Sequence, residues 1–301
     1  MPTLQDIMAR IETVANIKKV THAMQLVAAA KLTRAQERAQ TVRPYAQELD
    51  GILGTLAALS GDSEGETPMT MRFFEDEPEL ETTRESLFGE TKAERPALVV
   101  ITSDRGLCGS FNANLTRAGN AFIKKHPGAR LITLGKKALT YFEMVKIKPE
   151  FHREGISDKL SIEEIREITG RLVELYVNAE VDSVFLVYAK FRKGTLSDVT
   201  TQQFLPIPPV EGAEGADAYI LEPSRDQVFE SLIPLYATTA IFSALADSFA
   251  SEHGARMAAM QQATQNAEEI VDDLTITRNR MRQAAITKEL AEIVGGAEAL
   301  K

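Results

Sequence analysis

Two glycines in the segment Ser103–Asn112 stand where a phosphate-binding loop could form. The segment reads SDRGLCGSFN; it follows a run typical of a buried strand and precedes a helical pattern, and backbone amides at such a junction can bind phosphate. Neither complete phosphate signature occurs, because the chain has no G-x-x-x-x-G-K-[ST] and no G-x-G-x-x-G. Gly106 and Gly109 therefore fit a tight strand-to-helix turn better, and a phosphate-binding α/β enzyme is the alternative.

Nucleophilic and metal-assisted chemistry lack a suitable set of residues. A catalytic triad needs an imidazole beside a nucleophile, and no motif places a histidine near serine or near Cys108, the single cysteine. The four histidines are His22, His126, His152 and His253. No H-E-x-x-H, cysteine pair or EF-hand pattern occurs. We therefore expect a chain that is not an enzyme by itself, with no catalytic residue, metal or cofactor.

A basic run near the C-terminus is the third candidate. It lies in a helical pattern among apolar residues and consists of Arg278, Arg280, Arg282 and Lys288, with Glu289 beside them. One interpretation is a solvated helix face, the usual explanation of such a run. The other is a contact with another protein, because arginine with Gln283 and Thr287 offers directional donors suited to carboxylates. Spacing alone leaves both open.

Long terminal helices must carry these positions. From Leu4 to Leu59 apolar residues recur at every third or fourth position around one proline, Pro44, which predicts a helix. We expect its seam to include Ile17, Val20 and Val27, to shift by one position near Val27, and to continue as the heptad of a coiled coil. At about 1.5 Å per residue such a helix is longer than a compact domain, so it should protrude.

The C-terminal stretch Asp226–Val294 has the same periodicity, with Gly295 and Gly296 expected to end the helix. We expect this helix to pair with the N-terminal one and to reach beyond it. Ile286, Leu290 and Ile293 are assigned to the paired seam. The longest uncharged run of this region falls short of the ~20 apolar residues of a membrane span, so any membrane association should come through a partner.

The middle of the chain predicts an α/β domain. Short apolar runs at Ala97–Thr102, Leu131–Leu134 and Val184–Tyr188 alternate with helical patterns, and Thr195–Leu205 adds an edge strand. The expected fold class is α/β: a long antiparallel coiled coil of the terminal helices plus a central Rossmann-like domain with a small, mostly parallel sheet. The predicted organisation is a coiled-coil helix at 1–59, an acidic linker at 60–95, the α/β domain at 96–210, a linker at 211–225 and a coiled-coil helix at 226–301.

Charge is separated along the chain. The 301 residues carry a net charge of −9, which disfavours nucleic acid as a partner because phosphate backbones require surplus lysine and arginine. Ser60–Arg95 holds eleven acidic and four basic residues, whereas residues 1–45 hold seven basic and three acidic ones. The first helix is therefore suited to acidic partners. One cysteine and a charged N-terminal dozen residues fit a reducing cytoplasm without export.

Several separated stretches, in the right order, resemble one family. They are Val20–Leu32 with Arg43-Pro-Tyr45, Ser103–Asn112, Ser251–Met260 and Arg282–Gly296. Over nearly the whole chain the sequence resembles the gamma subunit of the F-type ATP synthase, in its bacterial form. The acidic stretch 60–95 is longer than the connection usual in that family.

The resemblance implies a rotor of the central stalk. Its paired helices would run along the axis of a ring of three alpha and three beta subunits, and its α/β domain would lie against the epsilon subunit and the membrane c-ring. It would couple c-ring rotation to the beta-subunit catalytic sites, as a peripheral protein on the cytoplasmic face of the inner membrane. Met24 matches a position facing the acidic lever loop of a beta subunit. Arg280, Arg282, Gln283, Thr287 and Glu289 match an upper beta-subunit contact.

An asymmetric shaft gives a physical reason for this role. A single coiled coil cannot share the symmetry of a threefold ring, so three identical neighbours meet three different faces. Driving a two-state site from 1:99 to 99:1 needs about 5.5 kcal/mol of differential binding, which face-specific contacts would supply. A coiled-coil tether without rotation is the remaining alternative.

Overall fold

The computed structural model describes residues 3–58, 95–156, 161–194, 196–205, 222 and 225–298. The acidic stretch 60–95 and the linker 211–225 lie outside this description except at one or two residues each. The chain forms two compact units, one of Met1–Ala29 with Arg256–Lys301 and the other of Ala30–Ala255. Both long helices contribute to both units, and each unit is described separately.

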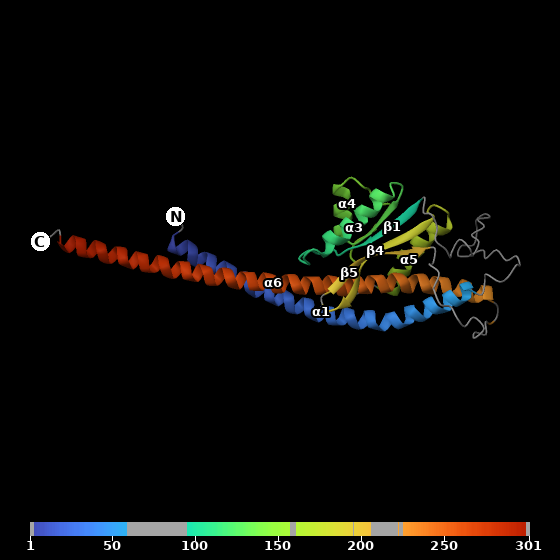
Figure 1. Cartoon of the computed structure of the whole chain (residues 1–301), viewed down its shortest axis with the longest axis horizontal. Helices are drawn as coiled ribbons and strands as arrows, with labels where there is room; N and C mark the ends of the chain where they lie inside the picture. Colours follow the sequence, from blue (N-terminus) through green and yellow to red (C-terminus); the bar gives the residue numbers. More distant parts are fainter. Residues whose placement is uncertain are drawn as a thin grey trace. The chain divides into compact units, whose positions relative to one another are not determined.

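A five-stranded sheet forms the centre of the Ala30–Ala255 unit (Figure 1). The strands are β1 (Pro96–Ile101), β2 (Arg130–Leu134), β3 (Phe151–Arg153), β4 (Ser183–Lys193) and β5 (Leu196–Leu205), in the order β3-β2-β1-β4-β5. The first four are parallel and β5 is antiparallel to β4. The mostly parallel sheet is thus confirmed. The three-residue β3 was not predicted, because its short polar sequence has no strand periodicity.

Helices cover both faces of this sheet. Helices α3 (Phe111–Lys125) and α4 (Lys136–Met144) connect β1 to β2 and β2 to β3, two steps toward the same edge of the sheet. Because such connections are right-handed, both helices lie on one face. Helix α5 (Ile162–Val177) connects β3 to β4 in the reverse direction and therefore lies on the other face. All six residues of β1 are buried, as expected of a central parallel strand. A core cluster joins β1, β2 and β4 to α3 and α4 and includes Leu98, Val100, Leu115 and Phe142.

Local signals in the sequence explain where the elements begin. Helix α5 starts with a capping box, in which the Ser161 hydroxyl accepts from the Glu164 amide while the Glu164 carboxylate accepts from the Ser161 amide. The Ser161 amide is the main cause that lowers the pKa of Glu164. Thr3 and Asp6 exchange the same two kinds of hydrogen bond at the start of the first helix, and the Thr3 amide likewise lowers the pKa of Asp6.

The two terminal helices are α1 (Leu4–Ala58) and α6 (Arg225–Glu298). Both are continuous through an internal proline, Pro44 and Pro234 respectively. Gly295 and Gly296 do not end α6, which continues for two more residues. An 18-residue window of α6 is apolar enough for a membrane span by composition, but 61% of it is buried within the protein, as in the core helix of a globular domain.

The buried positions of α1 follow one heptad without a shift. Ile7, Ala28, Leu32, Ala35, Ala39 and Leu49 are buried, and half-buried residues fill the intervening positions. Between Val14 and Ala28 these intervening positions are Lys18, Thr21 and Gln25. The prediction that Ile17, Val20 and Val27 lie on the seam was wrong, because all three are about half exposed, at 49%, 58% and 58%. The predicted register shift does not exist.

Polar contacts join the helices through this middle stretch. In the Met1–Ala29 and Arg256–Lys301 unit, Lys18 pairs with Glu268 at 2.7 Å, and the Thr264 hydroxyl donates to the Thr21 hydroxyl at 2.8 Å. Later residues of α6 thus meet earlier residues of α1, so the pair is antiparallel, as predicted. Met260 and Ala267 are buried on either side of Thr264. A polar seam costs stability but specifies which register the two helices adopt.

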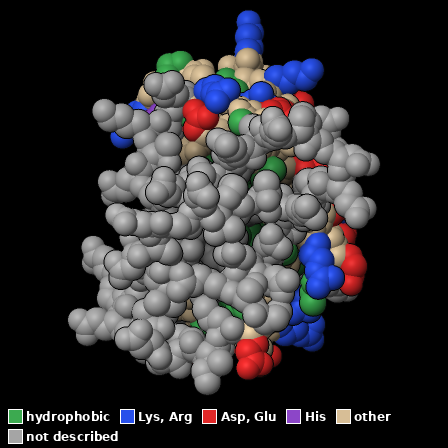
Figure 2. All heavy atoms as spheres, turned by 90° about the vertical axis from the view of Figure 1, so that its right-hand side faces the viewer, with side chains coloured by type: hydrophobic (Ala, Val, Ile, Leu, Met, Phe, Trp, Pro, Cys, Tyr) green, Lys and Arg blue, Asp and Glu red, His purple; other side chains and the backbone are tan. Residues whose placement is uncertain are grey.

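Figure 2 shows one face of the molecule, the right-hand side of Figure 1. Among the described side chains visible there, lysine and arginine are interspersed with aspartate and glutamate rather than gathered into one basic patch.

Candidate functional site

The basic run predicted as a contact lies on the unpaired end of α6. The register set by Lys18 and Glu268 brings Leu4, the first residue of α1, close to Met281, so α1 does not accompany α6 beyond that point. Every described side chain from Arg282 to Val294 is exposed. The predicted contact residues Arg280, Arg282, Gln283, Thr287 and Glu289 are therefore all exposed on the same helix. The prediction that α6 extends beyond α1 is confirmed.

Apolar side chains form a stripe on the same end. Ile286, Leu290, Ile293 and Val294 are 50%, 58%, 68% and 64% exposed and share one helix face by their spacing. The assignment of Ile286, Leu290 and Ile293 to the paired seam was wrong, because the seam continues from Leu274 through Arg278 to Met281, where α1 ends. A helix face this apolar and this exposed is suited to burial against another protein.

Local interactions leave the polar groups of this end available. The Thr287 hydroxyl donates to the carbonyl of Gln283 at 2.9 Å, and Lys288 pairs with Glu292 at 3.7 Å along the helix. Arg278 is half-buried and donates to the Asn279 side chain at 3.2 Å. Arg280, Arg282 and Glu289 have no ion-pair partner among the described residues. The two arginines can therefore offer guanidinium donors to carboxylates of a partner.

Met24 lies on a different part of the same unit. It is half-buried beside the seam position Gln25, on the turn after Thr21. By the Thr21–Thr264 register it stands near residue 261 of α6, roughly 20 residues or about 30 Å along the axis from Arg280. Met24 and the α6 group therefore cannot form one site. They are two separate surfaces of this unit.

The glycine-containing loop is closed by its own side chains. The Asn112 carbonyl accepts from the Ser103 amide at 3.0 Å, and its NH₂ group lies 3.1 Å from the buried Cys108 sulfur. The Ser103 hydroxyl donates to the carbonyl of Arg105 at 2.6 Å. Gly109 has a φ of +57°, which favours glycine in this turn. The loop is thus organised as a turn around Asn112, in agreement with the structural interpretation of its glycines.

We expect Asn112→Ala to lower the free energy of unfolding by about 1–3 kcal/mol, because the Ser103 amide and the loop interior lose their partners. Asn114→Ala is the matched control: Asn114 is exposed and bonds only the Ser110 hydroxyl, at 3.3 Å. Its effect should stay within about 0.5 kcal/mol. Urea unfolding of the full chain measures both, and equal effects would contradict the role assigned to Asn112.

An ion pair with a buried carboxylate, which the sequence did not reveal, joins α1 to α6 in the Ala30–Ala255 unit. Arg43 of α1 donates to the Asp247 carboxylate of α6 at 3.1 Å, and the Asp247 side chain is only 7% exposed. Burial raises the pKa of Asp247 against the opposing effect of Arg43. Burial also raises the pKa of the neighbouring Tyr188 of β4 to about 12, with a further contribution from Asp247. The Tyr188 hydroxyl donates to Gln202 of β5 at 2.9 Å.

Comparisons with known proteins agree with this architecture over the whole chain. The family model described as ATP synthase matches residues 3–300. The ATP synthase gamma chain of Heliobacterium modesticaldum is 39% identical over 309 residues, covering 100% of both chains. That of Symbiobacterium thermophilum is 40% identical over 296 residues, covering 97% of this chain and 96% of the relative.

A solved structure shows the same fold. A chain in the Euglena gracilis mitochondrial ATP synthase, in an assembly of OSCP, F1 and c-ring, superposes with a TM-score of 0.67 at 18% identity. The match covers 99% of this chain and 94% of that chain. Full-length identity near 40% to bacterial relatives, together with the matching family model, settles the affiliation. The chain belongs to the ATP synthase gamma chain family.

Proposed function

We propose that the chain is the central-stalk rotor of a proton-translocating ATP synthase, which turns with the c-ring and changes the three beta-subunit catalytic sites in sequence. The observation that carries the proposal is the exposed end of α6, which extends beyond α1 and has an apolar stripe. Arg280 and Arg282 on this end have no ion-pair partner among the described residues. A lone helix end presents a different face to each of three identical neighbours. This difference is what unequal conformations of identical sites require.

The predicted contact residues take their roles within this proposal. Arg280, Arg282, Gln283, Thr287 and Glu289 would contact one beta subunit at a time, with guanidinium groups on beta-subunit carboxylates. Met24, on a helix with a surplus of basic residues, would meet an acidic lever loop of a beta subunit at a lower level of the shaft. None of these residues would take part in the chemistry, and the subunit would be non-catalytic with no cofactor.

The partners proposed for the α/β domain are the epsilon subunit and the c-ring, and three alpha and three beta subunits would surround the helix pair. The chain would sit at the cytoplasmic face of the inner membrane, peripherally and through the complex. Purification of the tagged chain tests this directly. Alpha, beta and epsilon subunits should co-purify in a proportion of about 3:3:1 to the chain, and ATP turnover by the chain alone would contradict the proposal.

Arg282→Ala tests the contact at the end of α6. Loss of a hydrogen bond to a charged group should cost about 1.5–3 kcal/mol of coupling, or a tenfold or greater fall in ATP synthesis by the reconstituted complex. The free energy of unfolding of the chain should change by less than about 0.5 kcal/mol, because Arg282 is exposed. Lys124→Ala, an exposed cation in the last turn of α3, is the matched control. Unchanged synthesis in Arg282→Ala would refute the contact.

A reversible crosslink separates rotor from tether. If a disulfide between the end of α6 and a beta subunit blocks turnover and reduction restores it, the chain must move relative to that subunit. If turnover continues with the crosslink intact, the helix pair is a static tether.

A further inference from the structure

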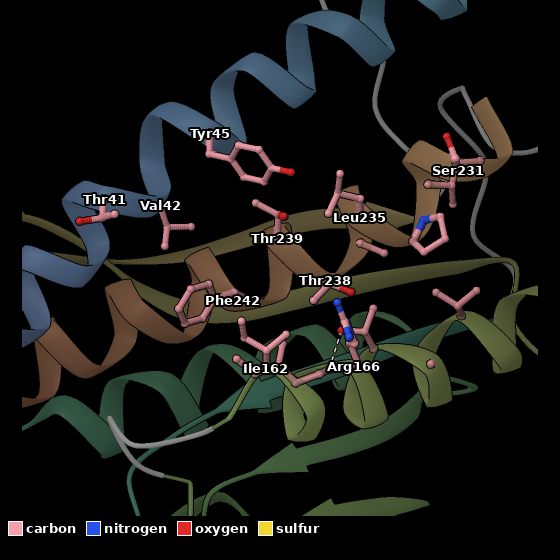
Figure 3. Close-up of a pocket in the computed structure, with 17 residues that line it drawn as sticks. Thr41, Val42, Tyr45, Ile162, Arg166, Ser231, Leu235, Thr238, Thr239 and Phe242 are labelled. Carbon is pink, nitrogen blue, oxygen red and sulfur yellow. Dashed lines mark hydrogen bonds between the residues drawn. The ribbon is translucent and has the colours of Figure 1, made fainter. Parts of the chain in front are cut away.

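A deep groove in the Ala30–Ala255 unit belongs neither to the proposed beta contacts nor to the sheet core. Three helices form its walls, α1, α5 and α6, and it encloses about 770 Å³ (Figure 3). We name it the three-helix groove. Thr41, Val42 and Tyr45 come from α1, Ile162 and Arg166 from α5, and Leu235, Thr238 and Phe242 from α6.

The groove exposes large apolar side chains. Tyr45, Ile162 and Leu235 are 48%, 55% and 39% exposed, although each lies on a helix with a buried side available. Thr238 and Phe242 continue the α6 wall at helical spacing from Leu235. An apolar hollow of this volume, formed by several elements, is typical of an interaction site rather than of a free surface.

A glycine opens the α5 wall. Gly170 lies inside α5 and lines the groove, and a Cβ added to it would meet no atom within 4 Å. Glycine inside a helix costs about 1 kcal/mol relative to alanine, and no packing within the described chain requires it here. The bare backbone lets another element approach α5 closely, as small residues do where helices pack.

The shape of the groove suits a helix. Ile162, Arg166, Gly170 and Val173 are spaced four, four and three residues apart on α5 and form one ridge, and Thr41 and Tyr45 do the same on α1. Side-chain ridges on three sides leave a channel for a fourth helix, as in a four-helix bundle.

The single charged side chain among the described residues that line the groove is basic. Arg166 lines it and has no ion-pair partner among the described residues. The neighbouring acids Glu164 and Glu167 both pair with Arg153, at 3.2 and 3.5 Å, which offsets one of their two negative charges. On α1, Arg34 and Arg38 are exposed near the face of Thr41 and Tyr45, and Glu37 and Glu48 are exposed there as well, so this helix adds no net charge beside the groove. A carboxylate of the occupant is thus favoured at Arg166.

We propose that the three-helix groove binds an amphipathic helix of another polypeptide, with its apolar face on Tyr45, Ile162 and Leu235 and a carboxylate on Arg166. The inference rests on the proposed function in one respect, because the partner is expected to be a subunit of the assembled complex. Close approach at Gly170 would allow helix-to-helix packing, and Arg166 would fix where the carboxylate of the bound helix lies.

Thiol labelling tests occupancy. The thiol introduced by Ile162→Cys should react with N-ethylmaleimide at least tenfold more slowly in the complex than in the free chain, as mapped by peptide mass spectrometry. Met144→Cys, at an exposed position of α4 outside the groove, should change little and is the control. Equal rates at position 162 in the two states, or slow labelling already in the free chain, would overturn the proposal. A chain that fails to assemble contradicts the proposed function instead.

Carbodiimide coupling tests the carboxylate. Arg166→Lys keeps the positive charge and supplies an amine, so treatment of the complex should join position 166 to an acidic residue of another chain. Coupling only to carboxylates of this chain would show that the chain fills its own groove and would overturn the proposal. Arg166→Glu should restore fast labelling of the Ile162→Cys thiol in the complex, whereas Arg117→Glu, at an exposed cation of α3, should not. No effect of the charge reversal would equally overturn it.

Discussion

Leu32→Pro is expected to abolish coupling and to destabilise the chain by at least 3 kcal/mol. Leu32 is buried in the heptad of α1, and a proline there removes one helical hydrogen bond, clashes with the carbonyl of Ala28 and deletes the leucine contacts. A kink of α1 at this proline would also separate α1 from α6. Urea unfolding of the full chain and ATP synthesis by the reconstituted complex measure the two losses.

Leu32→Pro can be compared with the natural proline of α1, Pro44, and with a substitution at an exposed residue. Pro44 lies on the exposed side of α1, where a break in the hydrogen-bond ladder leaves the seam intact. Ile293→Ala, at a position 68% exposed, should change the free energy of unfolding by less than about 0.5 kcal/mol. Comparable destabilisation by Ile293→Ala and Leu32→Pro would mean that the end of α6 is paired within the chain after all.

Arg43→Met is expected to lower the free energy of unfolding by about 1.5–3 kcal/mol, because the buried Asp247 carboxylate loses the cation that is hydrogen-bonded to it and keeps only the electrostatic effect of Lys190. Asp247→Asn should cost much less, since it removes the buried charge and keeps a polar group within reach of Arg43. The double variant should be more stable than Arg43→Met alone. A larger loss from Asp247→Asn than from Arg43→Met would show that the ion pair is net stabilising.

The pH dependence gives this prediction a sign. Burial raises the pKa of Asp247, so the folded chain binds the proton more tightly than the unfolded chain does. The stability gained from protonation is therefore present below the ordinary aspartate pKa and is lost as pH rises through the raised one. Arg43→Met should raise the pKa of Asp247 further. The loss in free energy of unfolding that this variant shows relative to the unchanged chain should therefore grow from pH 4 to pH 7, as measured by urea unfolding. With Asp247→Asn this dependence should disappear.

The sequence was sufficient for the elements and for their pairing. Alternating apolar runs located four of the five strands, and heptads located both terminal helices, because burial on one face leaves a period in the sequence. The seam itself was misplaced at Ile17, Val20 and Val27, where apolar residues face outward and Lys18, Thr21 and Gln25 occupy the seam. A strict heptad extended from Ile7 would have found it. Apolarity alone favoured the wrong positions, because this shaft has apolar side chains on its outer surface as well.

The candidate contacts were predicted only in part. The residues from Arg280 to Glu289 came from resemblance, and their exposure follows from the length of α6 relative to α1. The Arg43–Asp247 pair and the three-helix groove join residues far apart in the chain, so no local pattern marks them. Each depends on how helices cross, which periodicity does not specify.

The two helices that form the seam are translated far apart in time, α1 at the start of synthesis and α6 at its end. Lys18 and Glu268 are 250 residues apart, Thr21 and Thr264 are 243, and Arg43 and Asp247 are 204. At about 5–20 residues per second, the apolar stripe of α1 leaves the ribosome some 10–50 s before its complement. During that interval it is an open hydrophobic strip on a nascent chain, and we expect the first helix to be a chaperone client until translation is complete.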